Sequence, residues 1–507
     1  MRRRVGLGAG AVAAVAGVLA VVLGVQGRVT SLRAGPPQPV SEDPQLAINV
    51  NTTPVVAADP RRPEVLVAAG RVDAPRLACK VAVSTTGGEA WRPLDLPLPP
   101  GADNCFWPAV AFDGDGHLLV LFTPTGGPFN LPTGLWLQRF TPDFTADGSP
   151  LPVGGPLAFQ PRLAAEGRRV LVAWIQARDE RATKFLGFPP PPNPIVLARS
   201  EDGGRTFAPP VTVSEPSRLA VQPTLLAAPA GRVMVGALDL GDDRVTYESS
   251  HEGQPGPPPA ERWRVVMWVS SDGGASFGPA TTVADDVVPV QRVLIDLAPA
   301  PAFALDTARS RIYAAWESGH DVLLSWSGDG GGTWSPPRGV GPETGGQFLP
   351  GLGVAPDGRL DVAFYDRSRD PEDVLAEVVM ASSPDGGRSF DSGTVSDRPF
   401  DSIVGSFTGE NVMLGSHLAV VSRPAEAIVV WADTARGNRV NNIVDLVSAK
   451  VEIREGRAAR VPLVVAGLVL AALGALATAL SWPGRGAGRG RRRARPPAAS
   501  PPPPRPG

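Results

Sequence analysis

The chain has 507 residues, enough to bury a large core. Its 58 glycines and 57 prolines favour a turn-rich fold and argue against a mostly helical protein. Its net charge is −2, but ten arginines lie close to the two chain ends, so the segment between them is strongly acidic. An acidic body repels phosphates, which excludes nucleic acid as a partner.

The chain begins with an uncharged apolar run, residues 5–25, which follows three arginines. A run of this length is close to the roughly 20 residues that cross a bilayer as a helix. We therefore expect residues 1–27 to be a signal anchor or transmembrane helix, with a cleaved signal peptide as the alternative. Residues 28–43 are expected to be a linker.

Next in the chain come the only two cysteines, Cys79 and Cys105. Two thiols in a large protein suit either a reduced protein or one disulfide in an oxidising compartment. The apolar run favours the disulfide, and two unrelated buried thiols are the alternative.

An octapeptide of the form S-x-D-x-G-x-[ST]-[FW] recurs through the middle of the chain. Its aspartate can accept backbone N–H groups across a tight turn, its glycines permit positive φ, and its aromatic residue covers the hairpin. The first copy has Thr86 in place of the aspartate. The copies start at Ser84, Ser200, Ser270, Ser327 and Ser383, and the predicted structural aspartates are Asp202, Asp272, Asp329 and Asp385.

A second motif alternates with the octapeptide: a proline, an apolar strand, a turn and a second apolar strand. Its copies begin at Pro54, Pro108, Pro161, Pro223, Pro301 and Pro350, with a less regular one at Ser416. With a third strand and the octapeptide turn into a fourth, each unit has four antiparallel strands, as in propeller blades. The sequence predicts an all-β fold, a β-propeller over residues 44–450 with seven blades, six being the alternative. Residues 45–51 are expected to supply the outer strand of the last blade and close the ring.

After this body, residues 451–460 are expected to be a linker and residues 461–482 a second transmembrane helix, because they form another long apolar run. Residues 483–507 are predicted to be a basic, proline-rich cytoplasmic tail. Arginines flank the outer side of both apolar runs, so the positive-inside rule places both termini in the cytoplasm. The propeller is then held at the cell membrane, outside the cytoplasm.

The octapeptides and strand pairs resemble the sialidase-like BNR/Asp-box propeller superfamily over roughly residues 44–450. The resemblance implies a sialidase-like fold. Its sialidases use three arginines that bind a substrate carboxylate, a Tyr nucleophile paired with Glu, and an Asp acid/base. Tyr365 is the residue that matches the nucleophile best, with Asp366 and Glu317 as candidate acids. No Arg-Ile-Pro motif occurs near the start, and no arginine can be assigned to the triad.

In a propeller with this strand order, the octapeptide turns lie on one face and the loops between second and third strands on the other. Those loops carry most of the polar groups that could bind a carboxylate or polyol, although the same groups can tether loops by salt bridges. The candidate ligand-binding residues are Arg178, Asp179, Arg367, Arg369, Asp433 and Arg436.

No metal or cofactor is expected. Asp113-Gly-Asp-Gly116 has the start of a calcium loop but lacks its later ligands, so a tight turn explains it better. The sequence predicts a membrane-anchored propeller that binds a carbohydrate or an envelope protein. The alternative is an exo-glycosidase of sialidase type with a Tyr nucleophile.

Overall fold

The structure, a computed structural model, describes residues 26–41, 49–127, 130–178, 193–215, 219–241, 262–288, 298–341, 345–405 and 412–459. Residues Arg28–Gly456 form one compact unit. The predicted membrane segments lie outside the described residues, apart from Gln26 and Gly27. Within the described part of the chain, no helix has the length and hydropathy that a bilayer crossing requires.

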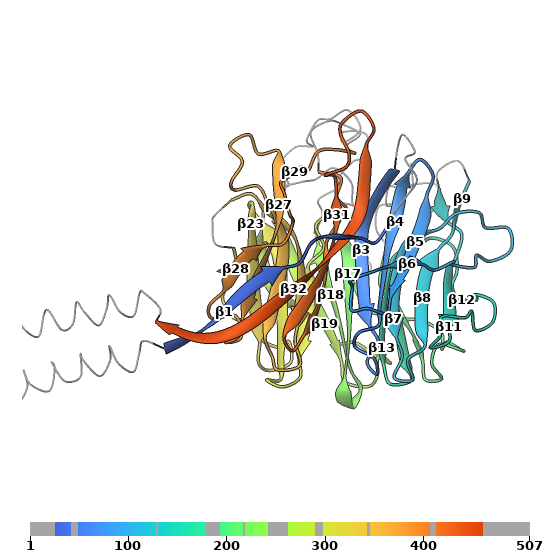
Figure 1. The fold of residues 1–507 in the computed structure, drawn as a ribbon. Coiled ribbons are helices and arrows are strands. Elements are labelled where there is room, and N and C mark those ends of the chain that lie inside the picture. Colours follow the sequence, from blue (N-terminus) through green and yellow to red (C-terminus); the bar gives the residue numbers. More distant parts are fainter. Residues whose placement is uncertain are drawn as a thin grey trace, which may run out of the picture. The chain divides into compact units, whose positions relative to one another are not determined.

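The fold is all-β, and its repeating unit is a sheet of antiparallel strands (Figure 1). Four of the sheets have four strands and one has five, while the first and last units are joined in a single nine-stranded sheet. The first strands of the units are β3 (Asn49–Ala58), β7 (Phe106–Phe112), β13 (Ala158–Glu166), β17 (Ala220–Ala228), β21 (Ala302–Asp306), β25 (Gln347–Val354) and β30 (Ala419–Arg423). The second strands are β4 (Leu66–Ala74), β8 (Leu118–Thr123), β14 (Arg169–Gln176), β18 (Arg232–Asp239), β22 (Arg311–Ser318), β26 (Leu360–Asp366) and β31 (Glu426–Asp433).

The outer halves of the units follow the same order. The third strands are β5 (Ala78–Ser84), β11 (Leu135–Phe140), β15 (Ile195–Ser200), β19 (Trp263–Ser270), β23 (Asp321–Ser327), β27 (Leu375–Ser383) and β32 (Ile443–Ala459). The fourth strands are β6 (Arg92–Pro93), β12 (Leu151–Gly154), β16 (Val211–Thr212), β20 (Thr281–Val287), β24 (Arg338–Gly339) and β28 (Asp391–Thr394). Short additions are the hairpin of β9 (Thr125–Gly126) and β10 (Leu131–Pro132), and β29 (Phe400–Asp401) beside β27.

The first strands form a closed circuit. Each of them contacts the first strand of the next unit, and β30 of the last unit contacts β3 of the first. The described residues therefore contain seven units around a centre that the first strands surround, which is the arrangement of a β-propeller with the favoured number of blades.

The seventh unit takes its outer strand from the start of the chain. β1 (Gln26–Ala34) and β2 (Gln38–Pro39) both pair with β32, and Thr30 also bonds Asp391 of the sixth unit through its backbone N–H at 2.7 Å. In Figure 1, β1 lies beside β32. The predicted linkers 28–43 and 451–460 are therefore wrong where they coincide with these strands.

Ring closure also differs in detail from the expectation for residues 45–51. Residues 42–48 lie outside the described part, and Asn49 and Val50 belong to β3, where they pair in parallel with Ile443 and Val444 of β32. The free edge is thus removed as expected, but β1 and β2 supply the strand.

A β-bulge recurs in the first strands. In five of them the pairing shifts at the residue before the repeated proline, and that residue has a φ of 46° to 51°. These residues are Thr53, Trp107, Gln160, Gln222 and Leu349. Gly415 holds the same place in the seventh unit, with a φ of 98°. A bulge changes the direction of the side chains beside it, so these positions shape the centre of the ring.

The octapeptides fold as the sequence predicts, and the copy at Ser270 is representative. Asp272 accepts the N–H groups of Ala275 and Ser276 at 2.9 and 3.0 Å, and the Ser276 hydroxyl at 2.6 Å. The Ser270 hydroxyl donates to Asp272 and accepts the N–H of Gly274. The bonds from Ser276 and Ser270 hold the pKa of Asp272 well below its usual range. The same bonds recur at Asp202, Asp329 and Asp385.

The position of the octapeptides defines the two faces of the ring. Gly273 donates its N–H to Gly231, in the turn between β17 and β18, at 2.8 Å. The octapeptides therefore share a face with the turns between first and second strands. The loops between second and third strands lie on the opposite face, as the sequence analysis expects.

Candidate functional site

Two polar side chains occupy the position that follows the repeated proline, where the other copies have small or apolar residues. Arg162 follows the bulge of β13 in the third unit, and His417 holds the equivalent position in the seventh unit, just before β30. The other units place Val55, Ala109, Thr224, Ala302 and Gly351 at this position. The charge of Arg162 contributes to lowering the pKa of His417 although the two residues belong to units that are not neighbours.

Arg162 has no counter-charge among the described residues. Its guanidinium donates to the Gln222 side-chain oxygen and to the Pro161 carbonyl, both at 3.1 Å. The Gln222 N–H in turn donates to the Gln160 side chain at 2.7 Å, which fixes this part of the centre. Burial and repulsion by Arg71 lower the pKa of Arg162 to about 10, so it stays charged at neutral pH. The result is an uncompensated positive charge.

Arg71 is the second arginine of this centre and comes from β4. Its side chain is only 4% exposed, and its Nε forms an ion pair with Asp73 at 3.0 Å. The Nε also donates to the Thr52 hydroxyl at 3.1 Å, and the guanidinium lies 4.8 Å from the centroid of the Phe106 ring. Nη1 is buried and has no partner among the described residues.

His417 is neutral at physiological pH. Burial, together with the charges of Arg162 and Arg71, lowers its pKa to about 3, against an opposing hydrogen bond to the Pro54 carbonyl. Its Nδ1 lies 3.0 Å from the Ser416 hydroxyl. The three residues Arg71, Arg162 and His417, called the central cluster below, combine two cations with a neutral imidazole.

Glu317 is a buried carboxyl group near the loop between the second and third strands of the fifth unit. It lies near the end of β22, is 6% exposed, and accepts the N–H of the bulge residue Leu349 at 3.0 Å. Burial raises its pKa to about 7, although that hydrogen bond and the charge of Arg367 oppose the rise. A carboxyl group with this pKa can act as an acid near neutral pH.

Arg367 lies beside Glu317 in the loop after β26. Its guanidinium stacks 5.0 Å from the Phe348 ring centroid, and its Nε donates to the Ser402 hydroxyl at 2.9 Å. Burial lowers its pKa. Among the predicted ligand-binding arginines that the structure describes, Arg367 is the largely buried one that lies beside Glu317.

Tyr365 does not fit the expected role of nucleophile. Its side chain is fully buried, and its hydroxyl donates to the Ala432 carbonyl at 3.2 Å and accepts the Ala432 N–H at 3.0 Å. Burial raises the pKa of Tyr365 far above its usual value, which disfavours the phenolate. The ring stacks on Phe348. The hydroxyl therefore joins the sixth unit to the seventh.

Most of the other predicted site residues tether their own loops. Asp366 accepts the Ser368 N–H at 2.7 Å, and Asp433 accepts the Trp431 indole N–H at 2.8 Å. Arg369 pairs with Glu377 at 3.1 Å, Arg436 pairs with Asp445 at 3.3 Å, Arg178 is exposed, and Asp179 lies outside the described residues.

The turn of Asp113, Asp115 and His117 brings three possible metal ligands within 4.8 Å of one another. Asp113 Oδ1 accepts the N–H groups of Asp115 and His117, both at 2.9 Å, and Arg139 Nη1 lies 3.9 Å from its other oxygen. These bonds are those of a tight turn, as the sequence analysis expects.

The central cluster was missed in the sequence, although a signal for it exists. When the seven copies of the second motif are aligned at the proline, Arg162 and His417 are the two residues with basic side chains at the following position. Arg71 carries no such signal, because it reaches the cluster only through the pairing of β4 with β3.

No protein-family profile matches the chain, and no curated protein matches its sequence. Among solved structures, a protein of unknown function from Dyadobacter fermentans is 13% identical, with a TM-score of 0.46 over 83% of this chain and 99% of its own. An alpha-L-arabinanase from Penicillium chrysogenum is 12% identical, with a TM-score of 0.45 over 83% of this chain and 98% of its own. A sialidase described as Hadza microbial is 15% identical, with a TM-score of 0.41 over 79% of this chain and 65% of its own. Matches of this strength carry no information about activity.

Proposed function

We propose that this protein is a membrane-anchored, extracytoplasmic propeller that binds an acidic carbohydrate at the central cluster. The observation that carries the proposal is the positive charge of Arg162, which no carboxylate among the described residues neutralises. The Arg162 side chain is half-buried. A charge that is partly withdrawn from water and has no partner is costly, and a ligand carboxylate would reduce that cost. Arginine suits this role because its planar group binds carboxylates through two parallel hydrogen bonds.

The groups around Arg162 support a sugar rather than a simple ion. Thr53 and Ser416 place hydroxyl groups beside the central cluster, and the neutral His417 can donate or accept a hydrogen bond. Such groups can bind the hydroxyls of a sugar whose carboxylate is held by the arginine.

The proposal is tested with the full-length protein in detergent on an array of acidic and neutral oligosaccharides, followed by titration of the ligands found. We expect acidic sugars to bind, and Arg162→Gln to weaken them by about tenfold or more, as for a lost charged hydrogen bond. Arg369→Gln is the matched control, because Arg369 is exposed and paired with Glu377. Binding that is equal for neutral sugars, or unchanged in Arg162→Gln, contradicts the proposal.

A glycosidase is the second candidate, favoured by the pKa of about 7 at Glu317. A general acid needs such a value to be protonated when the leaving group departs. Glu317→Gln keeps an oxygen that can accept the Leu349 N–H, as the Gln160 amide does for Gln222. Turnover of fluorogenic glycosides that disappears in Glu317→Gln supports an enzyme, and binding without turnover contradicts it.

The membrane part of the proposal rests on the two apolar runs, residues 5–25 and 461–482, and on the arginines outside them. The disulfide between Cys79 and Cys105 supports an oxidising compartment for the propeller. Protease added to intact cells should degrade the propeller while the tail stays protected. A tail that is digested from outside contradicts this orientation.

A further inference from the structure

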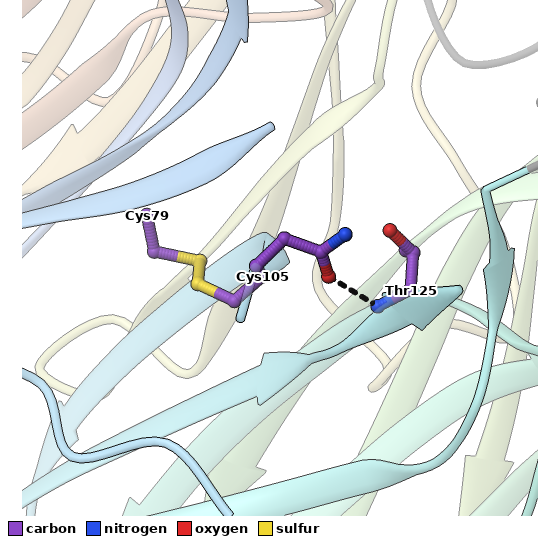
Figure 2. Close-up of a disulfide and its surroundings, with 4 residues drawn as sticks. Cys79, Cys105 and Thr125 are labelled. Carbon is purple, nitrogen blue, oxygen red and sulfur yellow. Dashed lines mark hydrogen bonds between the residues drawn. A yellow bond between two sulfur atoms is a disulfide. The ribbon is translucent and has the colours of Figure 1, made fainter. Parts of the chain in front are cut away.

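The junction of the first two units holds a further group of donors, which includes Arg71 of the central cluster, and its proposed role rests on the function proposed above. Arg71 in β4 is paired directly opposite Cys79 in β5. Cys105 comes immediately before Phe106 and Trp107 at the start of β7. The disulfide between Cys79 and Cys105, with Cα atoms 5.6 Å apart, therefore joins the strand pair that carries Arg71 to the strand that carries the two rings (Figure 2).

The joined side chains form a continuous stack. The Arg71 guanidinium lies 4.8 Å from the Phe106 ring centroid, and the Phe106 and Trp107 rings meet edge to face at 4.6 Å. Trp107 also contacts Phe159 of the third unit at 5.6 Å. Trp107 is a bulge residue with a φ of 46°, so its backbone is held in a conformation that few side chains adopt.

Two N–H donors in this stack have no acceptor among the described residues. They are Nη1 of Arg71 and Nε1 of Trp107, and both side chains are at least nine-tenths buried. Trp174 and Trp431, which are also buried, each donate their indole N–H to a side-chain oxygen. Leaving a buried donor without an acceptor costs about 1–3 kcal/mol, so two of them beside the same ring point to an acceptor supplied from outside.

We infer that Arg71 and Trp107 form a two-donor subsite for an oxygen of the acidic sugar, and that the disulfide Cys79–Cys105 holds these donors in position. The turn that precedes β7 is fixed by further bonds. The Thr125 N–H donates to the Asn104 side chain at 2.9 Å, and Arg76 pairs with Asp103 at 2.7 Å. The disulfide is the one covalent link in this set, so its loss should loosen the donors most.

Trp107→Phe tests the donor directly, because it keeps an aromatic ring at the bulge and removes only the indole and its N–H. In titrations of the full-length protein with the acidic sugar found on the array, we expect affinity to fall by about tenfold. The affinity for the neutral analogue of that sugar, which lacks the carboxylate, should fall by a similar factor when the indole N–H bonds a sugar hydroxyl. Affinity for both sugars equal to that of the wild type overturns the subsite.

The double variant Cys79→Ser/Cys105→Ser tests the positioning role. We expect weaker binding at a temperature well below its unfolding transition. Asp272→Ala is the matched control, since it removes an octapeptide carboxylate in a distant unit and lowers stability without touching the subsite. A double variant that binds as tightly as Asp272→Ala overturns the positioning role. Wild type that binds no acidic sugar contradicts the proposed function itself, whereas binding that depends on Arg162 but not on Trp107 or the cysteines contradicts this inference alone.

Discussion

The carboxyl group of Glu317 accepts the backbone N–H of Leu349 at 3.0 Å, so a titrating side chain of the fifth unit holds the bulge of the sixth. Gln160 makes the equivalent bond to the bulge residue Gln222 with a group that does not titrate. The two junctions therefore differ in their response to pH.

Glu317 should make the protein less stable as the pH rises. Its pKa in the folded state is about 7, above the ordinary value of 4.5, so the folded chain keeps a proton that the unfolded chain loses. The stabilising contribution is full below pH 4.5 and is lost as the pH rises through about 7. The loss is about 3 kcal/mol. Urea unfolding at pH 5 and pH 8 should show this fall in the wild type and not in Glu317→Gln, and equal falls in both would refute it.

Arg162 should reduce the stability of the unliganded protein. Replacing it by Gln removes a half-buried positive charge that repels Arg71. We expect this to stabilise by about 1 kcal/mol, or roughly 1 °C in Tm for a unit of this size. Added sulfate should raise the Tm of the wild type more than that of Arg162→Gln, because an anion at the centre supplies the missing charge. Thermal scans with and without sulfate measure both effects. A lower Tm for the variant in the absence of sulfate would disagree with this account.

Tyr365→Phe should affect stability and leave ligand affinity unchanged. The change removes the hydroxyl that bonds both backbone groups of Ala432, at a cost of about 1–3 kcal/mol. Denaturant unfolding and the sugar titration are the two measurements. If the variant lost turnover at full stability, Tyr365 would act in catalysis after all.

The N-terminal strands should be essential for a stable ring. We compare the fragments 28–456 and 42–456, because only the first retains most of β1 and all of β2. The longer fragment should unfold cooperatively, whereas the shorter one leaves the β32 edge open and should aggregate or unfold at lower temperature. Light scattering and thermal unfolding distinguish them. The substitution Thr30→Ala, which removes the hydroxyl bond to Asp391 at 3.1 Å, should have a smaller effect in the same direction.

The repeats made the architecture predictable, because each octapeptide and each strand pair has a local reason for its conformation. Asp272 and its equivalents bond within their own turns, so a short window of sequence is enough to find them. The closing strand was predicted at residues 45–51, but β1 and β2, which lie earlier in the chain, supply it. The pairing of Gln38 with Ser448 has no local signal in the sequence.

The candidate site was predicted poorly because its contacts, like the pairing of the closing strand, join residues that are far apart in the sequence. Asp433 and Arg369 attract attention as charged residues near loops. In the structure, Asp433 ends β31 and accepts the indole N–H of Trp431, and Arg369 pairs with Glu377 of β27. Arg71 reaches the centre only because β4 pairs with β3 and packs on Phe106. Whether a charge has a partner depends on the folded ring, and the local sequence does not record it.

The pairing of β1 with β32 also sets the timing of biosynthesis. β1 is synthesised before the other described strands, but its partner β32 is the last of them. Leu446 of β32, for example, donates its N–H to the hydroxyl of Ser41, which lies 405 residues earlier in the chain. Ring closure therefore waits until β32 has been synthesised, and the earlier units expose an unpaired edge until then. Such long-range pairing also slows the final folding step. A protein of this design needs protection from aggregation while it is being synthesised, and its yield should depend on chaperones that hold the growing chain.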